Sequence, residues 1–75
     1  MDIRKVFGAN VRFYRLAAGL SQEAVAVRMG ADRAYISAIE RGRQNVTLLT
    51  VWQTAQALKV RPADLIMEID LKSKP

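Results

Sequence analysis

The stretch SQEAVAVRMGADRAYISAIERGR, residues 21–43, decides the fold of this chain. Ser21 is a favoured N-cap residue, because its hydroxyl can accept a hydrogen bond from a free backbone N–H. Apolar side chains then recur at helical spacing on one stripe: Val25, Ala26 and Met29. Gly30 follows, and glycine adopts the left-handed backbone of a tight turn at little cost. The pattern predicts a short helix that ends in a sharp turn.

A second short helix is predicted directly after this turn. Asp32 is its expected N-cap, and its underside is apolar, with Ala31, Ile36 and Ile39. The opposite face carries Arg33, Ala34, Ser37 and Arg41, with Tyr35 at the flank. Two short helices joined at a glycine form a helix-turn-helix, whose second helix fits the major groove of DNA.

Length and composition limit the class of protein. We expect a single domain over residues 1–75, with a core at about 7–66, a motif at about 21–41 and a short tail at 67–75. The chain has no cysteine and no histidine, so we expect no metal, no cofactor and no thiol or imidazole catalysis. No apolar run reaches the ~18 residues that a membrane span needs. These features predict a soluble cytoplasmic protein without a membrane partner.

Positive charge is concentrated around the motif. The net charge is +5, and residues 4–61 contain ten basic side chains against three acidic ones. From Pro62 onward two lysines accompany three acids. Basic surface on the helix-turn-helix half favours a polyanion on one side of the molecule.

The rest of the chain predicts three more helices. One covers about Ile3 to Ala17 and ends at Gly19, with Val6, Phe7, Val11 and Tyr14 facing inward. Another starts after the expected cap Thr47 and carries Leu48, Val51, Trp52, Ala55 and Leu58 on or near one face. The last runs from about Pro62 to Met67, since proline suits the first position of a helix. The predicted fold class is therefore all-α, a compact five-helix domain.

These residues resemble the Cro/lambda-repressor-type helix-turn-helix family, also called the XRE family. The similarity runs from about Phe7 to Ile66 and is carried by separated positions: Arg12, Arg15, Gly19–Glu23, Ala26, Gly30, Tyr35–Ser37, Ile39–Gly42, Leu48, Val51, Ala55 and Leu58. Within the family, residues 32–37 and 43–47 are most similar to controller proteins of restriction-modification systems. Lys59, Arg61, Val46 and Thr54 depart from the family pattern.

Individual DNA contacts can be predicted on this basis. Arg33 starts the second motif helix, and arginine can make a bidentate contact to guanine O6 and N7; a phosphate contact is its alternative role. Ser37 lies one turn further on, while Ala34 offers only a methyl group. Tyr35 either contacts DNA or covers the core.

Other polar residues are expected at the DNA backbone. Gln22 stands in the first turn of the first motif helix, where its amide and nearby N–H groups can hold a phosphate. The remaining candidates follow the second motif helix: Arg41, Arg43, Gln44 and Asn45. The resemblance further implies that Arg15 and Glu40 form an internal salt bridge, which makes them structural.

A two-fold dimer is expected, since the relatives place two copies on half-sites about 34 Å apart. The interface candidates are Leu65, Ile66, Met67, Ile69 and Leu71. Residues 67–71 alternate strictly, so this segment could instead pair as a short strand across the dimer.

The function expected from these features is that of a transcriptional regulator, not an enzyme. Its partners would be double-stranded DNA, a second copy of the chain and, in one hypothesis, RNA polymerase; no small-molecule ligand is expected. Occupying a promoter would repress by blocking polymerase or activate by contacting it. The alternative is a protein-interaction module of the same fold, an antitoxin-like or coactivator-like subunit, which would show a neutral outer face on the second motif helix.

Overall fold

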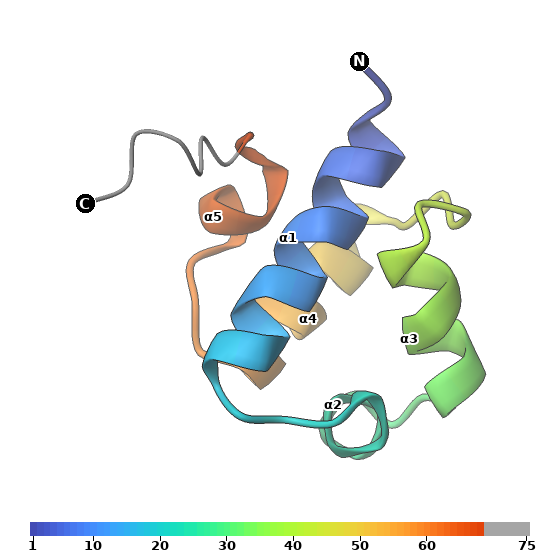
Figure 1. The fold of residues 1–75 in the computed structure, drawn as a ribbon, viewed down its shortest axis with the longest axis vertical. Coiled ribbons are helices and arrows are strands. Elements are labelled where there is room, and N and C mark those ends of the chain that lie inside the picture. Colours follow the sequence, from blue (N-terminus) through green and yellow to red (C-terminus); the bar gives the residue numbers. More distant parts are fainter. Residues whose placement is uncertain (69–75) are drawn as a thin grey trace.

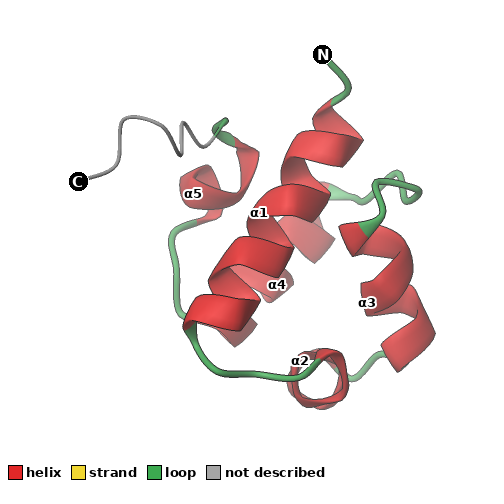
Figure 2. Ribbon diagram, in the orientation of Figure 1, coloured by secondary structure: helices red, strands yellow, loops and turns green. Residues whose placement is uncertain are grey.

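A computed structural model describes residues 1–68, and all of their regular structure is helical (Figures 1 and 2). The helices are α1 (Ile3–Ala17), α2 (Gln22–Met29), α3 (Arg33–Glu40), α4 (Leu48–Leu58) and α5 (Pro62–Ile66). The prediction of a compact all-α domain with five helices is confirmed. Only α5 is shorter than expected, by one residue at its end.

Two of the three predicted caps form. Ser21 Oγ accepts a hydrogen bond from the Ala24 N–H at 3.0 Å, and Thr47 Oγ1 accepts one from the Thr50 N–H at 3.1 Å. The side-chain cap predicted for Asp32 is wrong. Asp32 holds the N-cap position, but its side chain makes no cap hydrogen bond because the exposed carboxylate faces solvent. Its backbone carbonyl accepts the first hydrogen bonds of α3 instead.

The core lies where α1, α2 and α3 meet the inner sides of α4 and α5. Its buried apolar side chains come from all five helices: Phe7, Val11, Val25, Ala26, Ile36, Ile39, Ala55, Ala57, Leu58 and Leu65. Ala26 is 1% exposed on α2, which packs against α3, and a methyl group suits two closely packed helices. The apolar stripes predicted for α2 and α3 therefore face inward.

The apolar stripe predicted for α4 is only partly buried. Ala55 and Leu58 lie in the core beside Thr54, whose hydroxyl is satisfied by the Thr50 carbonyl at 2.7 Å. Leu48 and Trp52, in contrast, are 89% and 51% exposed. Successive residues of an α-helix are rotated by 100°, so Trp52 lies about a third of a turn away from the buried stripe. Leu48 lies in the first turn of the helix and faces solvent.

The end of α5 is tied to α1 by a buried amide. Asn10 Nδ2 donates to the Leu65 carbonyl at 2.8 Å and to the Met67 carbonyl at 2.7 Å. Leu65 itself is fully buried in the monomer, so its prediction as a dimer contact is wrong. Leu65 and Ile66 are adjacent apolar residues of α5, and the sequence did not show which of them completes the monomer core. Ile69 and Leu71, and with them residues 69–71 of the predicted strand, lie outside the described residues.

The start of α5 is stabilised from inside the helix. Arg61 holds the N-cap position, where no short polar side chain is available to cap. The Asp64 carboxylate compensates by accepting from the Arg61 backbone N–H at 3.0 Å and from its guanidinium at 3.0 Å. These bonds lower the pKa of Asp64, the side-chain bond from Arg61 being the main cause.

Gly8 permits the close approach of α1 to the end of α3. A Cβ atom at this position would lie 2.2 Å from the Ile39 carbonyl oxygen, far inside van der Waals contact. Gly8→Ala should therefore destabilise the fold by a net ~1 kcal/mol, because the steric cost exceeds the gain in helix propensity. Chemical denaturation measures this, with Ala9→Gly as the exposed control. A rise in stability for Gly8→Ala would contradict the packing described here.

Candidate nucleic-acid interface

The C-terminal end of α3 is held by an ion pair from α1. Arg15 Nε donates to Glu40 Oε2 at 2.6 Å and Arg15 Nη2 donates to Glu40 Oε1 at 3.0 Å. The two side chains are only 10% and 4% exposed, and the hydrogen bond to Glu40 raises the pKa of Arg15. The predicted internal salt bridge is present. Its bidentate geometry fixes the orientation of both side chains as well as their distance.

The same pair also fixes the entry into α2. Arg15 Nη1 donates to the Leu20 carbonyl at 3.0 Å, and Gln22 Nε2 donates to Glu40 Oε1 at 3.1 Å. The first turn of α2 is therefore linked through Glu40 to the last turn of α3. One amide hydrogen of Gln22 is committed to Glu40, which leaves one for a ligand outside the protein.

The turn between the motif helices sets the angle of α3. Gly30 caps α2 with φ 66°, and the Ala31 N–H donates to the Ala26 carbonyl at 2.9 Å. Ile36 and Ile39 are buried beneath α3, and Tyr35 is half-buried against the same core. Tyr35 therefore packs at the flank of the helix with part of its ring accessible.

The outer face of α3 consists of Arg33, Ala34, Ser37 and Arg41. Arg33, Ala34 and Arg41 are exposed, and Ser37 is half-buried. The loop that follows adds exposed Arg43 and Asn45 and half-buried Gln44. The sequence-predicted contact residues therefore form one continuous segment from the start of α3 through the following loop, with Gln22 joined to it through Glu40. Donors dominate this surface.

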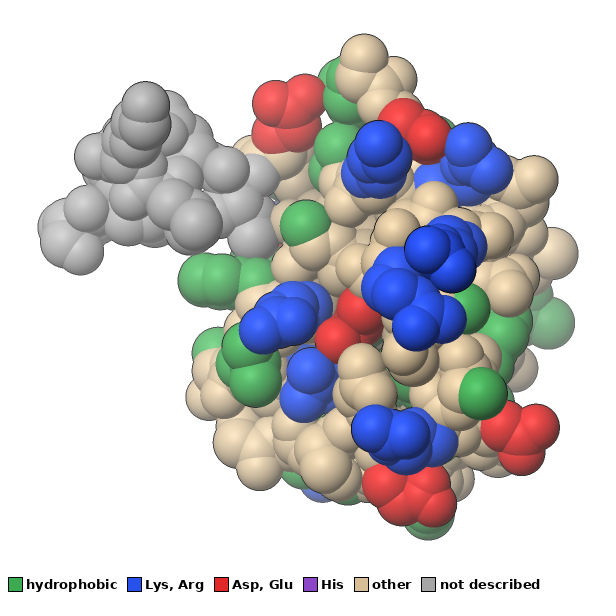
Figure 3. Space-filling model, turned by 45° about the vertical axis from the view of Figure 1, so that its right-hand side comes forward, with side chains coloured by type: hydrophobic (Ala, Val, Ile, Leu, Met, Phe, Trp, Pro, Cys, Tyr) green, Lys and Arg blue, Asp and Glu red, His purple; other side chains and the backbone are tan. Residues whose placement is uncertain are grey.

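Two basic residues of α1 extend the surface and were not among the predicted contacts. Lys5 lies against Gly42, whose φ of 74° closes the turn after α3. Lys5 and Arg12 are exposed and share a stripe of α1 with Gly8 and Arg15, the residues that face α3. This spacing was a usable signal in the sequence. Figure 3 shows that Lys and Arg side chains gather on the face that α1 and α3 form.

Other kinds of site find little support in the part of the chain that the structure describes. Within residues 1–68, no three His, Cys, Asp or Glu side chains come together as a metal site. Over the same residues, no helix combines the length and the hydrophobicity that crossing a bilayer requires.

Two short helices joined at a glycine turn, with donors on the outer face of the second, have the arrangement of the helix-turn-helix class of DNA-binding domain. The helix-turn-helix family HTH_3 matches residues 11–65. The chain belongs to this family of transcription regulators.

Two named relatives are similar to the chain over most of its length. It is 43% identical over 70 residues to the HTH-type transcriptional regulator y4dJ of Sinorhizobium fredii, covering 93% of this chain and 91% of that one. The crystal structure of the restriction-modification controller C.AhdI from Aeromonas hydrophila is similar at a TM-score of 0.79 with 42% identity, covering 83% and 94% of the two chains.

A third relative was solved on DNA. The controller C.Esp1396I, as a tetramer in complex with its natural 35 base-pair operator, matches at a TM-score of 0.78 with 28% identity, covering 87% and 86% of the two chains. The present chain is therefore a helix-turn-helix transcription regulator related to restriction-modification controller proteins.

Proposed function

We propose that this protein binds a pseudo-palindromic operator as a homodimer, with α3 of each copy in the major groove. The observation that carries this proposal is the outer face of α3, which presents Arg33 and Arg41 to solvent on a helix fixed at both ends. Arg33 starts the helix and is placed to contact base edges. Ser37 lies one turn further on, and the Ala34 methyl suits a thymine methyl.

Phosphate contacts would fix the register of the dimer on the duplex. We assign them to the second amide hydrogen of Gln22 and to Arg41, Arg43, Gln44 and Asn45, with Lys5 and Arg12 of α1 at the edge of the same surface. Tyr35 would contact the DNA only with the part of its ring that the core leaves free. Operator binding by the related controller C.Esp1396I supports DNA as the partner.

An NMR titration with a duplex of mixed sequence at low salt tests this surface. The proposal predicts shifts in the first turn of α2, along the outer face of α3 and in the loop after it. Shifts confined to α4 and α5, or none from folded protein, would contradict it and would favour a protein-docking role.

The second copy has to be held by surface outside the DNA contacts. The exposed apolar patch of α4, formed by Leu48, Leu49 and Trp52, follows the loop that leaves α3. These side chains are 89%, 63% and 51% exposed. Ile66 and Met67 at the end of α5 are also about half exposed. We assign the homodimer contact to the α4 patch, with Ile66 and Met67 in support, because burial of this apolar surface would drive association.

Leu48→Glu should convert the dimer to a monomer. Leu48 is 89% exposed, so the change costs the monomer little, whereas a carboxylate would be desolvated in the interface. Sedimentation equilibrium reports the oligomeric state. Val27→Glu is the matched control, since Val27 is a 73% exposed apolar residue on α2. A Leu48→Glu protein that still dimerises would place the interface elsewhere.

We further propose that protein concentration and dimerisation control its occupancy of the promoter, where it would act on polymerase. We place this activity in the cytoplasm.

A further inference from the structure

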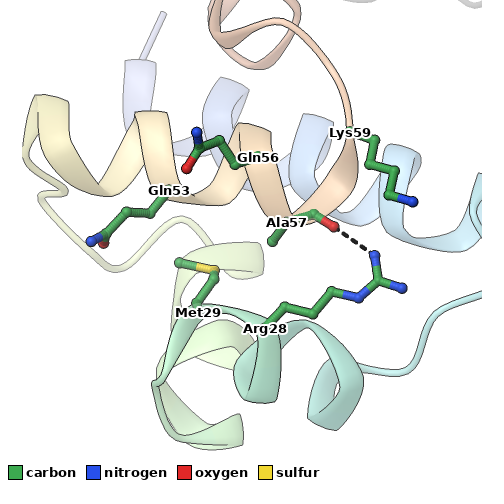
Figure 4. Close-up of a pocket in the computed structure, with 6 residues that line it drawn as sticks. All are labelled: Arg28, Met29, Gln53, Gln56, Ala57 and Lys59. Carbon is green, nitrogen blue, oxygen red and sulfur yellow. Dashed lines mark hydrogen bonds between the residues drawn. The ribbon is translucent and has the colours of Figure 1, made fainter.

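A pocket of about 520 Å³ lies between the C-terminal parts of α2 and α4, outside the proposed DNA contacts. It is lined by Arg28, Met29, Gln53, Gln56, Ala57 and Lys59. Figure 4 shows the guanidinium of Arg28 and the ammonium of Lys59 together at one end, with Gln53 toward the other and Met29 between them. The pocket is an open groove lined mainly by polar and charged residues.

The guanidinium of Arg28 is held in place. Arg28 Nη1 donates to the Ala57 carbonyl at 2.8 Å, which links α2 to the last turn of α4 (Figure 4). This bond uses one of the five guanidinium hydrogens and anchors the group at the end of α4. The remaining donors keep the fork geometry that matches the oxygens of a phosphate or carboxylate.

Lys59 stands on a backbone that disfavours a side chain. Its φ is 59°, and it is the only residue other than glycine among residues 1–68 with a positive φ. A side chain in this left-handed region carries a steric cost that glycine avoids. Lys59 contributes no core packing, since its side chain is exposed at the pocket. Backbone strain at a pocket residue is a pointer to function.

The positive charge at this end is not neutralised by side chains of the described part of the chain. Salt bridges there join Arg4 to Asp2, Arg15 to Glu40 and Arg61 to Asp64, and none includes Arg28 or Lys59. The ends of α2 and α4 contribute roughly half a negative charge each. Two cations against these two helix ends leave about one positive charge.

We propose that this pocket binds the dianionic phosphate group of a small phosphate monoester. The free edge of Arg28 would take two phosphate oxygens, and the Lys59 ammonium would add a second positive charge. A monoester carries about −1.5 to −2 charges at pH 7, so the remaining positive charge attracts it more strongly than the single charge of a DNA phosphodiester. Met29 and Ala57 would contact an apolar part of the ligand, and the Gln53 amide a polar group.

Phenyl phosphate is the probe for an NMR titration at constant ionic strength. The expected result is saturable shifts in residues 28–30 and 53–59, with dimethyl phosphate, a monoanionic diester, binding at least ~10-fold more weakly. Lys59→Gly should fold at least as stably as the parent, since glycine relaxes this backbone, yet weaken phenyl phosphate binding by about 10-fold or more. Arg28→Gln should weaken phenyl phosphate binding by a similar factor. Arg4→Gln, a loss of one exposed cation outside both the pocket and the proposed DNA contacts, should leave phenyl phosphate binding unchanged.

Equal binding by the parent and by Lys59→Gly would overturn the proposal. So would shifts spread over α3 and the loop after it, since these indicate general attraction of anions to a basic protein. Equal binding of phenyl phosphate and dimethyl phosphate would also overturn it, because the pocket would then not select a dianion. The titration contains no DNA, so its outcome is independent of the proposed operator binding.

Discussion

Glu40→Ala is expected to lower the free energy of unfolding by about 3 kcal/mol, the lower end of the range for removing one partner of a buried ion pair. The loss follows from what remains: Arg15 stays charged beside the core, only 10% exposed, without its carboxylate. Gln22 loses its acceptor at the same time. Urea denaturation followed by circular dichroism measures the change.

Two further variants separate burial from charge. Arg61→Gln removes a cation from an ion pair whose arginine is 77% exposed, and its denaturation midpoint should stay close to that of the parent. The double variant Arg15→Met with Glu40→Leu should be more stable than Glu40→Ala alone, because it leaves no buried charge unpaired. If Glu40→Ala were no more destabilising than Arg61→Gln, the pair would not brace α3.

Arg33→Ala is expected to weaken binding to the preferred operator by about 1–3 kcal/mol, or roughly 5- to 150-fold in the dissociation constant. The reason is its place as the first residue of α3, exposed and free of the hydrogen bonds that hold the end of that helix. The loss of affinity should depend on the base pair at one position of the operator. At that position the variant should bind operators that carry other bases almost equally well. Fluorescence anisotropy with a set of single-substituted operators provides this comparison.

Arg43→Ala is the control for a contact to phosphate alone. It should weaken binding to all sequences by a similar factor and reduce the slope of log K against log salt by about one. Arg33→Ala and Arg43→Ala are therefore distinguished by how the loss of affinity varies among operator sequences, and not by the size of the loss. A uniform loss for Arg33→Ala across every operator would show that Arg33 contacts only the backbone.

The positions of the helices could be predicted from local signals. Which apolar residues are exposed could not, because exposure depends on how the helices pack. Caps at Ser21 and Thr47 and glycine stops at 19, 30 and 42 are short-range features, so the positions of the helices follow from the chain. Leu65 and Leu48 were not predictable in this way. Both belong to apolar segments, but one fills the core and the other faces solvent.

The candidate site could be predicted in its centre and less well at its edges. Arg33, Ser37 and Arg41 recur on one face of a helix, and that periodicity is visible in the sequence. Lys5 was missed although it shares a helical stripe with Arg12 and Arg15. Its spacing does not show its contact with Gly42, which is a tertiary contact between α1 and the turn after α3. The hydrogen bond from Gln22 to Glu40 likewise joins residues 18 apart in the chain, which helical spacing cannot show.

Selection from a random duplex library at near-physiological salt, with the oligomeric state measured on the same sample, tests the central proposal most directly. The proposal predicts a dimer that enriches an inverted repeat with half-sites about one helical turn apart. Failure of the folded protein to enrich any sequence would contradict it, and would assign the outer face of α3 to binding a protein instead of DNA.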